Sequence, residues 1–133
     1  MDEKGFDKEK IIRYWIDSAE EDYDTMLTLY ENNKNSWALF VGHLVIEKLL
    51  KGKVVKVIND HAPLTHDLRR LAKQSGMDFE NKHGEWLDTI TTFNISARYD
   101  SYKHSFYKRS TPAFTAEWVE KIKELREWIK KRL

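Results

Sequence analysis

The chain has 133 residues, with 23 lysines and arginines against 22 aspartates and glutamates, and it has no cysteine. This length predicts one domain over residues 1–133, whose 41% hydrophobic content can form a core without disulfides or a structural metal. The absence of cysteine excludes disulfide frameworks, thiolate metal sites and a cysteine nucleophile.

The net charge of +1 conceals an uneven distribution of charge along the chain. Residues 1–31 carry 4 basic and 10 acidic side chains, whereas residues 98–133 carry 10 basic and 5 acidic ones. The total argues against indiscriminate nucleic-acid binding, but the basic last quarter permits a local phosphate site. The first residues lack the pattern of a signal peptide, and no apolar run reaches the ~20 residues that span a bilayer. We therefore expect a cytoplasmic protein without membrane attachment.

Hydrophobic periodicity predicts two long helices in the first half of the chain. Asp7 caps a first helix that ends near Glu31, because apolar side chains recur every three or four residues between them. After a tight turn, Asn35 or Ser36 caps a second helix that reaches Ile58. This second helix is apolar on most sides, which is typical of the middle of a bundle, and the short turn predicts that the two helices pack antiparallel.

The second half of the chain predicts three more helices. Thr65 caps a short helix that Gly76 ends, and a fourth helix covers residues 80–95. Residues 97–113 show no clear period and are expected to be irregular, and Thr115 caps a last helix that reaches the end of the chain. The predicted fold is all-α, an antiparallel up-and-down four-helix bundle with one additional short helix.

Two features of these helices raise the question of partners. Glu47 and Lys48 interrupt the apolar run of the second helix, and His43 lies one turn before Glu47. Because a buried carboxylate without partners is costly, we expect Glu47 to pair with a cation from a neighbouring helix or a partner chain. His66 follows the expected cap Thr65, and capping does not explain it.

The sequence favours neither a metal nor another cofactor. A di-iron bundle needs two Glu-x-x-His motifs, and only Glu80 and His83 form one. The chain also lacks a glycine-rich phosphate loop and a Gly-x-Ser-x-Gly motif. Nucleotide-hydrolase and serine-hydrolase functions therefore have no support in the sequence.

The segment after residue 97 carries cations, a histidine and three tyrosines in a stretch without periodicity. Arg98 suits stabilisation of a phosphate, His104 suits proton transfer during RNA cleavage, and interleaved tyrosines suit unstacked bases. Lys103, Lys108 and Arg109 are candidates for contacts with phosphates. The alternative interpretation is that the aromatic side chains and an arginine attach a long loop to the bundle, while the cations are solvated.

Several short motifs occur in a characteristic order: Trp15, Ala19 and Asp22-Tyr23; Trp37-Ala38 and Phe40; Glu47-Lys48-Leu-Leu-Lys51; Thr65-His66-Asp67-Leu68-x-x-Leu71; and Ala97-Arg98-Tyr99. In these motifs the chain resembles the HEPN domain family, from about Ile12 to Leu133. The resemblance implies an antiparallel helical bundle that usually dimerises and that prokaryotes often encode beside a minimal nucleotidyltransferase. It also implies nucleotide binding, toxin–antitoxin pairing with that transferase, or metal-independent RNA cleavage.

The ribonuclease branch of the family is marked by an Arg followed after four to six residues by a His. Arg98 and His104 fit this spacing, since five residues separate them. Tyr99, however, stands where that branch commonly has a polar residue, and Phe106 stands where its toxins have a tyrosine.

The sequence therefore favours an accessory or binding protein without enzyme activity. In this interpretation a homodimer binds the phosphate of a nucleotide or RNA through Arg98, Lys103, Lys108 and Arg109, or pairs with a minimal nucleotidyltransferase in a toxin–antitoxin-like module. The alternative is a metal-independent ribonuclease that uses Arg98 and His104, and a third hypothesis is a purely structural helical adaptor.

Overall fold

A computed structural model describes residues 6–133, and in this part of the chain the protein forms six helices and no strand. The first five residues, which contribute to the expectation that no signal peptide is present, lie outside the described residues. No helix of the described chain is both long enough and apolar enough to cross a membrane. The predicted all-α fold is confirmed.

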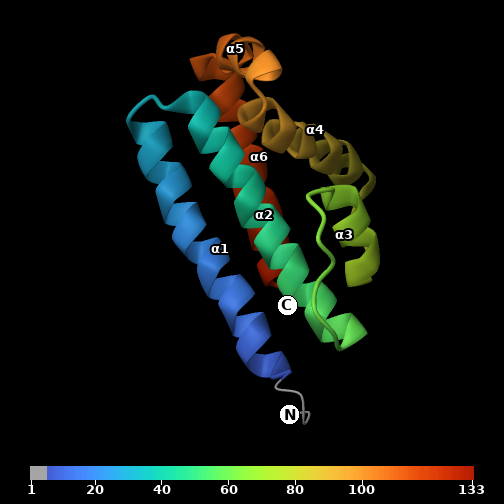
Figure 1. Ribbon diagram of the computed structural model, residues 1–133. Coiled ribbons are helices and arrows are strands. Elements are labelled where there is room, and N and C mark those ends of the chain that lie inside the picture. Colours follow the sequence, from blue (N-terminus) through green and yellow to red (C-terminus); the bar gives the residue numbers. More distant parts are fainter. Residues whose placement is uncertain (1–5) are drawn as a thin grey trace.

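Helices α1 (Lys8–Glu31) and α2 (Asn35–Ile58) form a long antiparallel pair (Figure 1). The carboxylate of Asp7 accepts a hydrogen bond from the Lys10 backbone N–H, so Asp7 is the predicted cap of α1. Between the helices, Asn33 adopts a left-handed conformation with φ of 60°, which reverses the chain within three residues. The start of α2 differs slightly from the prediction, since Lys34 occupies the cap position and makes no side-chain capping bond.

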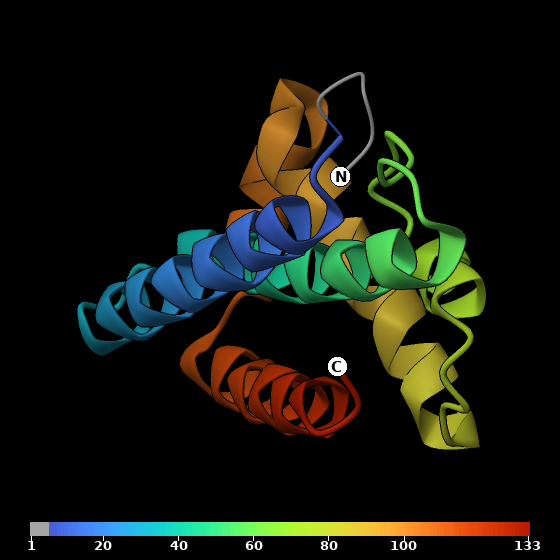
Figure 2. The ribbon, with the colours of Figure 1, turned by 90° about the horizontal axis from the view of Figure 1, so that it is seen from below.

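Helix α2 is the central element of the bundle and contacts α1, α3 (Leu68–Ser75), α4 (Asn81–Arg98) and α6 (Pro112–Lys130). Seen from below, α6 lies on one side of the α1 and α2 pair, and α4 runs obliquely across α2 (Figure 2). The largest fully buried side chains come from all of these helices: Met26, Leu39, Ile46, Leu49, Leu50, Leu68, Leu71, Leu87, Ile90, Phe93, Ile122 and Leu125. The apolar character of α2 on most sides follows from this central position.

The cap of α3 differs from the prediction. Asp67, not Thr65, is the N-cap, and its carboxylate accepts from the backbone N–H groups of Arg69 and Arg70. The Thr65 hydroxyl accepts from the Asp67 N–H instead, and so stabilises the turn before the helix. Gly76 ends the helix as predicted, in a left-handed conformation with φ of 71°.

The expectation of an irregular segment over residues 97–113 is wrong. Helix α4 continues to Arg98, and a further helix, α5 (Asp100–Arg109), follows after a single extended residue, Tyr99. Phe106 is the only buried residue of α5, and its ring stacks on Phe93 with centroids 5.5 Å apart. A single buried apolar residue in ten produces no helical period, so hydrophobic periodicity does not predict this helix.

The start of α6 also lies earlier than predicted. Thr111 caps it by accepting from the Phe114 backbone N–H, and Pro112 occupies the first turn. Thr115, the predicted cap, is buried inside the helix.

Candidate functional site

Helix α2 carries a polar stripe through an otherwise apolar surface. His43, Glu47 and Lys51 follow one another at intervals of four residues and therefore lie on one face. All three are buried, and the carboxylate of Glu47 accepts a hydrogen bond from Lys51 Nζ at 3.2 Å. The Lys51 ammonium also lies 5.3 Å from the centre of the Trp15 ring. The predicted cation for Glu47 thus exists, but it comes from the same helix and not from a neighbouring one.

The second partner of Glu47 is His66, which belongs to the connector between α2 and α3. Its Nδ1 lies 2.7 Å from Glu47 Oε1, while half of the His66 side chain, 51%, stays exposed. Nε2 of His43 donates to the backbone carbonyl of His66 at 2.9 Å. Helix α2 therefore fixes both the backbone and the ring of His66, one through His43 and the other through Glu47.

Arg98, at the end of α4, completes the arrangement. Its Nη1 lies 3.2 Å from Nε2 of His66 and 3.4 Å from Oδ1 of Asn94, one turn earlier on α4. Because a guanidinium only donates, Nε2 of His66 accepts this bond, and the ring proton is assigned to Nδ1 and is donated to Glu47. Glu47, His66 and Arg98 form a connected chain, hereafter the His66 network, in which each ring nitrogen of His66 has one partner and the contacts assign the tautomer.

Local contacts explain why the connector meets α4 at this point. The Leu68 backbone N–H, at the first residue of α3, donates to the Thr91 hydroxyl of α4 at 3.1 Å. Thr91 precedes Arg98 by two helical turns on the same side of α4. The start of α3 is thereby attached beside the face of α4 that carries Arg98, and His66 lies two residues before Leu68.

His43 has a structural role beside the network. Burial lowers its pKa, and the opposing effects of the bond to the His66 carbonyl and of the nearby Glu47 carboxylate do not compensate for this. The ring is therefore neutral at neutral pH, with its proton on Nε2, and Nδ1 lies buried 3.8 Å from Glu47 Oε1 without a hydrogen bond.

Arg98 combines an orienting contact with His66 and Asn94 and a charge that no ion pair among the described residues neutralises. It is exposed, and among residues 6–133 no carboxylate lies within ion-pair distance of it. Only Nη1 is engaged, so the remaining N–H groups of the guanidinium are free for an anion. Arg69, by contrast, is held by both oxygens of Asp88 at 3.0 and 2.6 Å.

The cations that the sequence assigned to phosphate contacts lie on different sides of α5. Lys103 forms an ion pair with Asp100 at 3.4 Å and lines a cavity of about 170 Å³ together with Trp37 and Tyr107. Lys108 is exposed and has no ion-pair partner among the described residues. Arg109 lies over the Phe114 ring at 4.9 Å, which matches the alternative interpretation of an arginine that attaches this segment to the bundle.

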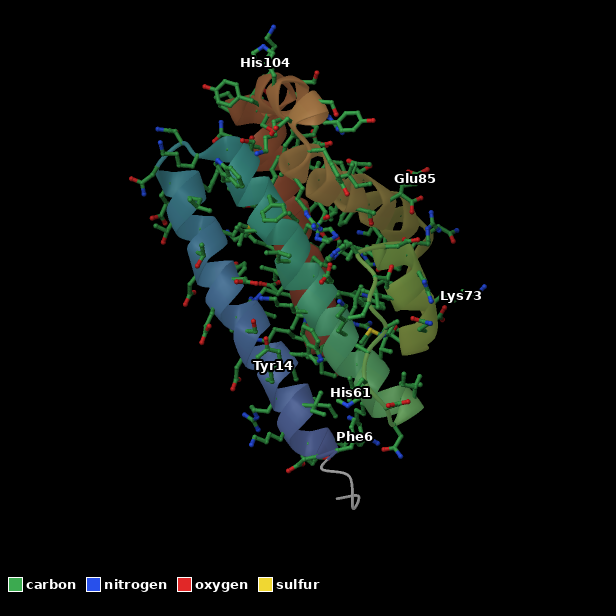
Figure 3. The ribbon with its side chains drawn as sticks, viewed as in Figure 1. Phe6, Tyr14, His61, Lys73, Glu85 and His104 are labelled. Atoms are coloured by element: carbon green, nitrogen blue, oxygen red, sulfur yellow. The ribbon has the colours of Figure 1, made fainter. Side chains whose placement is uncertain are left out.

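His104 does not meet Arg98 within the described chain. It is exposed on α5, at the end of the molecule and directed away from the bundle (Figure 3), and no hydrogen bond or ion pair joins it to Arg98. The extended residue Tyr99 separates the two helices that carry Arg98 and His104. The histidine that contacts Arg98 is His66, 32 residues earlier in the chain.

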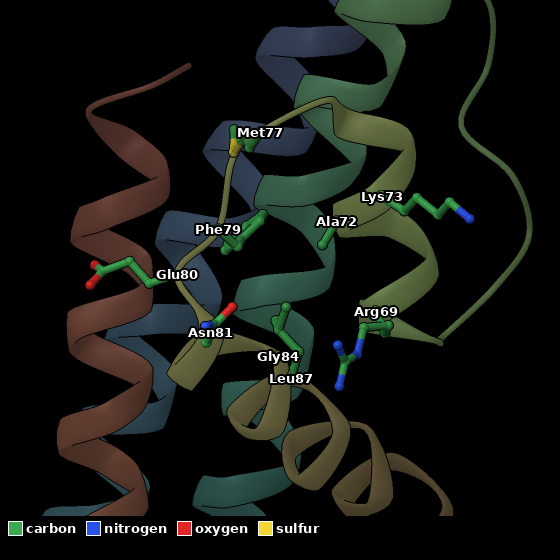
Figure 4. Close-up of a pocket in the computed structure, with 9 residues that line it drawn as sticks. All are labelled: Arg69, Ala72, Lys73, Met77, Phe79, Glu80, Asn81, Gly84 and Leu87. Carbon is green, nitrogen blue, oxygen red and sulfur yellow. The ribbon is translucent and has the colours of Figure 1, made fainter.

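A separate cavity of about 330 Å³ lies between α3 and the start of α4 (Figure 4). Arg69, Phe79, Glu80 and Leu87 are among its lining residues, and no member of the His66 network lines it. Within residues 6–133, no three histidine or acidic side chains converge in a way that could hold a metal ion.

Comparison with known proteins agrees with the helical architecture. A family model of the HEPN domain matches residues 12–133. The chain belongs to the HEPN domain family. The fold of this HEPN domain is similar to the crystal structure of TT1696 from Thermus thermophilus, with a TM-score of 0.77 and 16% identity over 92% of this chain and 98% of the other. No curated protein matches the chain in sequence.

Proposed function

We propose that this HEPN domain is a cytoplasmic accessory protein that binds the phosphate of a nucleotide or RNA as a homodimer and works with a minimal nucleotidyltransferase. The observation that carries the proposal is the state of Arg98: an exposed guanidinium, oriented by His66 and Asn94, with no carboxylate partner among the described residues. An arginine held in this way presents paired donors to a phosphate.

The surroundings of Arg98 suit a nucleotide or a single RNA strand. Tyr99 and Tyr102 expose 56% and 54% of their surface, and the exposed Lys108 lies further along α5. Exposed aromatic rings beside cations stack with unpaired bases and attract the backbone.

The homodimer is supported by apolar side chains at the same end of the bundle. Trp37 and Ile95 are about half exposed, and Tyr107 exposes 71% of its surface. Aromatic side chains of this kind are enriched in protein interfaces. Light scattering on the purified protein tests this directly, and Trp37→Glu is expected to shift a dimer to monomer.

A binding titration tests the phosphate site. We expect fluorescence anisotropy with a labelled short RNA, and competition by AMP, to show binding that Arg98→Ala weakens by about tenfold or more, since a charge-assisted hydrogen bond contributes about 1.5–3 kcal/mol. Arg13→Ala is the matched control, because Arg13 is an exposed arginine on α1. Equal binding by the wild type and Arg98→Ala would remove the proposal, whereas a loss that appears only when Lys103, Lys108 and Arg109 are all alanine would move the site to α5.

The ribonuclease alternative keeps one supporting observation: His104 is exposed, as a proton-transfer group must be before substrate binds. Since it does not contact Arg98 within the protomer, a catalytic pair requires the second protomer. RNA cleavage in EDTA that is lost in His104→Ala supports this function, and intact RNA excludes it.

A further inference from the structure

We propose that His66 is a proton-linked ligand of the bound phosphate: when an anion binds to Arg98, Nε2 of His66 takes up a proton and donates to the same anion. This inference rests on the phosphate-binding function proposed above, and it assigns a role to the half-exposed histidine of the His66 network.

The hydrogen bonds of the free site give the reason. Nε2 of His66 lies 3.2 Å from Arg98 Nη1 and accepts from it, so the single lone pair of this nitrogen is directed at Arg98 and the nitrogen carries no proton to donate. A phosphate oxygen also presents lone pairs and cannot bond to such a nitrogen. An anion that approaches Arg98 therefore either avoids His66 or requires a proton on Nε2.

The network favours the second outcome. The buried Glu47 carboxylate lies 2.7 Å from Nδ1 and accepts its proton, so a cationic ring would have one negative group at Nδ1 and the anion at Nε2. In the free protein the only group of the described chain bonded to Nε2 is the Arg98 guanidinium, which is a cation and a donor. A bound anion places a negative acceptor beside both Arg98 and Nε2.

The other groups around His66 do not supply or remove this proton. Lys51 is paired with the second oxygen of Glu47 at 3.2 Å, and His43 donates its own proton to the His66 carbonyl. The carboxylate of Asp67 accepts from the backbone of α3. One proton comes from solvent to Nε2 on binding, and it breaks the hydrogen bond from Arg98 Nη1 to Nε2, so that both groups donate to the anion instead. On release the proton returns to solvent and the bond from Arg98 forms again, and no covalent bond between heavy atoms changes.

The chemistry identifies a phosphate group as the ligand, either the diester of an RNA backbone or the monoester of a nucleotide. Two cationic donors that lie side by side, one guanidinium and one imidazolium, match two oxygens of one phosphate. The diester and the monoester differ in charge, and the monoester itself takes up a proton near neutral pH, because its second pKa is about 6. The diester is thus the cleaner probe.

Calorimetry in buffers of different ionisation enthalpy measures the proton directly. The wild-type protein is titrated with a short RNA without terminal phosphates, and separately with AMP, at about pH 7.5. We expect uptake approaching one proton per site with the RNA, and binding that weakens by up to about tenfold per pH unit as the pH is raised. Binding of RNA alone assigns the site to the backbone diester, and binding of AMP alone assigns it to a nucleotide.

His66→Asn is the informative variant, because its side-chain amide can still donate to Glu47 but has no titrating nitrogen to face the anion. We expect weaker binding without the proton uptake of the wild type, and the difference in uptake between the two proteins is the readout for either ligand. His61→Asn is the matched control, since His61 is another exposed histidine of the same connector and lies outside the network.

The outcomes separate the two proposals. Wild-type binding that depends on Arg98 but involves no proton uptake, together with equal affinity of His66→Asn, overturns the role of His66 and leaves the phosphate-binding function intact. Failure of both the RNA and AMP to bind overturns both. Because the uptake and its pH dependence are measured on the wild type, the test does not depend on the variant being folded.

Discussion

The buried ion pair of α2 allows a quantitative test of the polar stripe. The Glu47 and Lys51 side chains are only 6% and 7% exposed, and each is the main charge partner of the other. Replacing Glu47 by leucine leaves a buried ammonium without its carboxylate, and breaking such a pair typically costs about 3–5 kcal/mol. The Trp15 ring near Lys51 retains part of the stabilisation through a cation–π contact of about 1 kcal/mol. We therefore expect Glu47→Leu to lower the free energy of unfolding by about 3 kcal/mol.

The double variant Glu47→Leu/Lys51→Met provides the control. It removes both charges together, and replacement of a buried pair by apolar residues of similar volume is often neutral or stabilising. We expect its unfolding free energy to lie within about 1 kcal/mol of the wild type, since the remaining loss is the bond to the half-exposed His66 ring, which water can replace.

Urea denaturation gives the coupling free energy when it is applied to the wild type, Glu47→Leu, Lys51→Met and the double variant. Two results would contradict a coupled buried pair: a Glu47→Leu variant as stable as the wild type, or a double variant whose loss of stability equals the sum of the two single losses. Either result means that Glu47 and Lys51 are solvated well enough to be independent.

Three further predictions concern individual residues. Burial lowers the pKa of His43, so the unfolded state binds more protons, and the free energy of unfolding should fall as the pH drops below about 6.5, by up to about 1.4 kcal/mol per pH unit. Urea titrations at several pH values should show a weaker pH dependence in His43→Gln, and an identical dependence would contradict the assignment. Gly76→Ala should cost about 1 kcal/mol by thermal unfolding, because φ is 71° and no atom lies within 4 Å of the new Cβ, so only backbone strain acts; an unchanged Tm would mean that the helix end relaxes. Asp67→Ala should cost about 1 kcal/mol as the loss of the α3 cap, and Thr65→Ala less, since Asp67 is the capping residue; the reverse order in urea would restore the sequence-based assignment.

Most of the fold was predictable because its long helices are strongly periodic. The ends of α1 and the stop at Gly76 follow from capping chemistry that is local in sequence. Local chemistry failed where two caps compete: both Thr65 and Asp67 can cap, and the attachment of Leu68 to Thr91 fixes the position where α3 begins. That bond joins residues far apart in the chain.

The candidate site was predictable in part. A carboxylate in an apolar helix must have partners, so the sequence indicates that Glu47 is paired. The identity of the partner is a tertiary fact, since His66 reaches Glu47 from a connector that sequence reasoning cannot orient. The neighbours of Arg98 in sequence indicate its importance, but the break at Tyr99 directs His104 elsewhere, and the residue that contacts Arg98 is His66.

We propose the His66 network as the phosphate site, with a histidine that changes protonation on binding. Imidazole nitrogen NMR of the protein, recorded during titration with a short RNA without terminal phosphates, observes both properties in one experiment. The free protein should show His66 with a protonated Nδ1 and an unprotonated Nε2, and saturation should protonate both nitrogens. If the RNA binds while the nitrogen signals of the His66 ring do not change, His66 is not a proton-linked ligand of the phosphate.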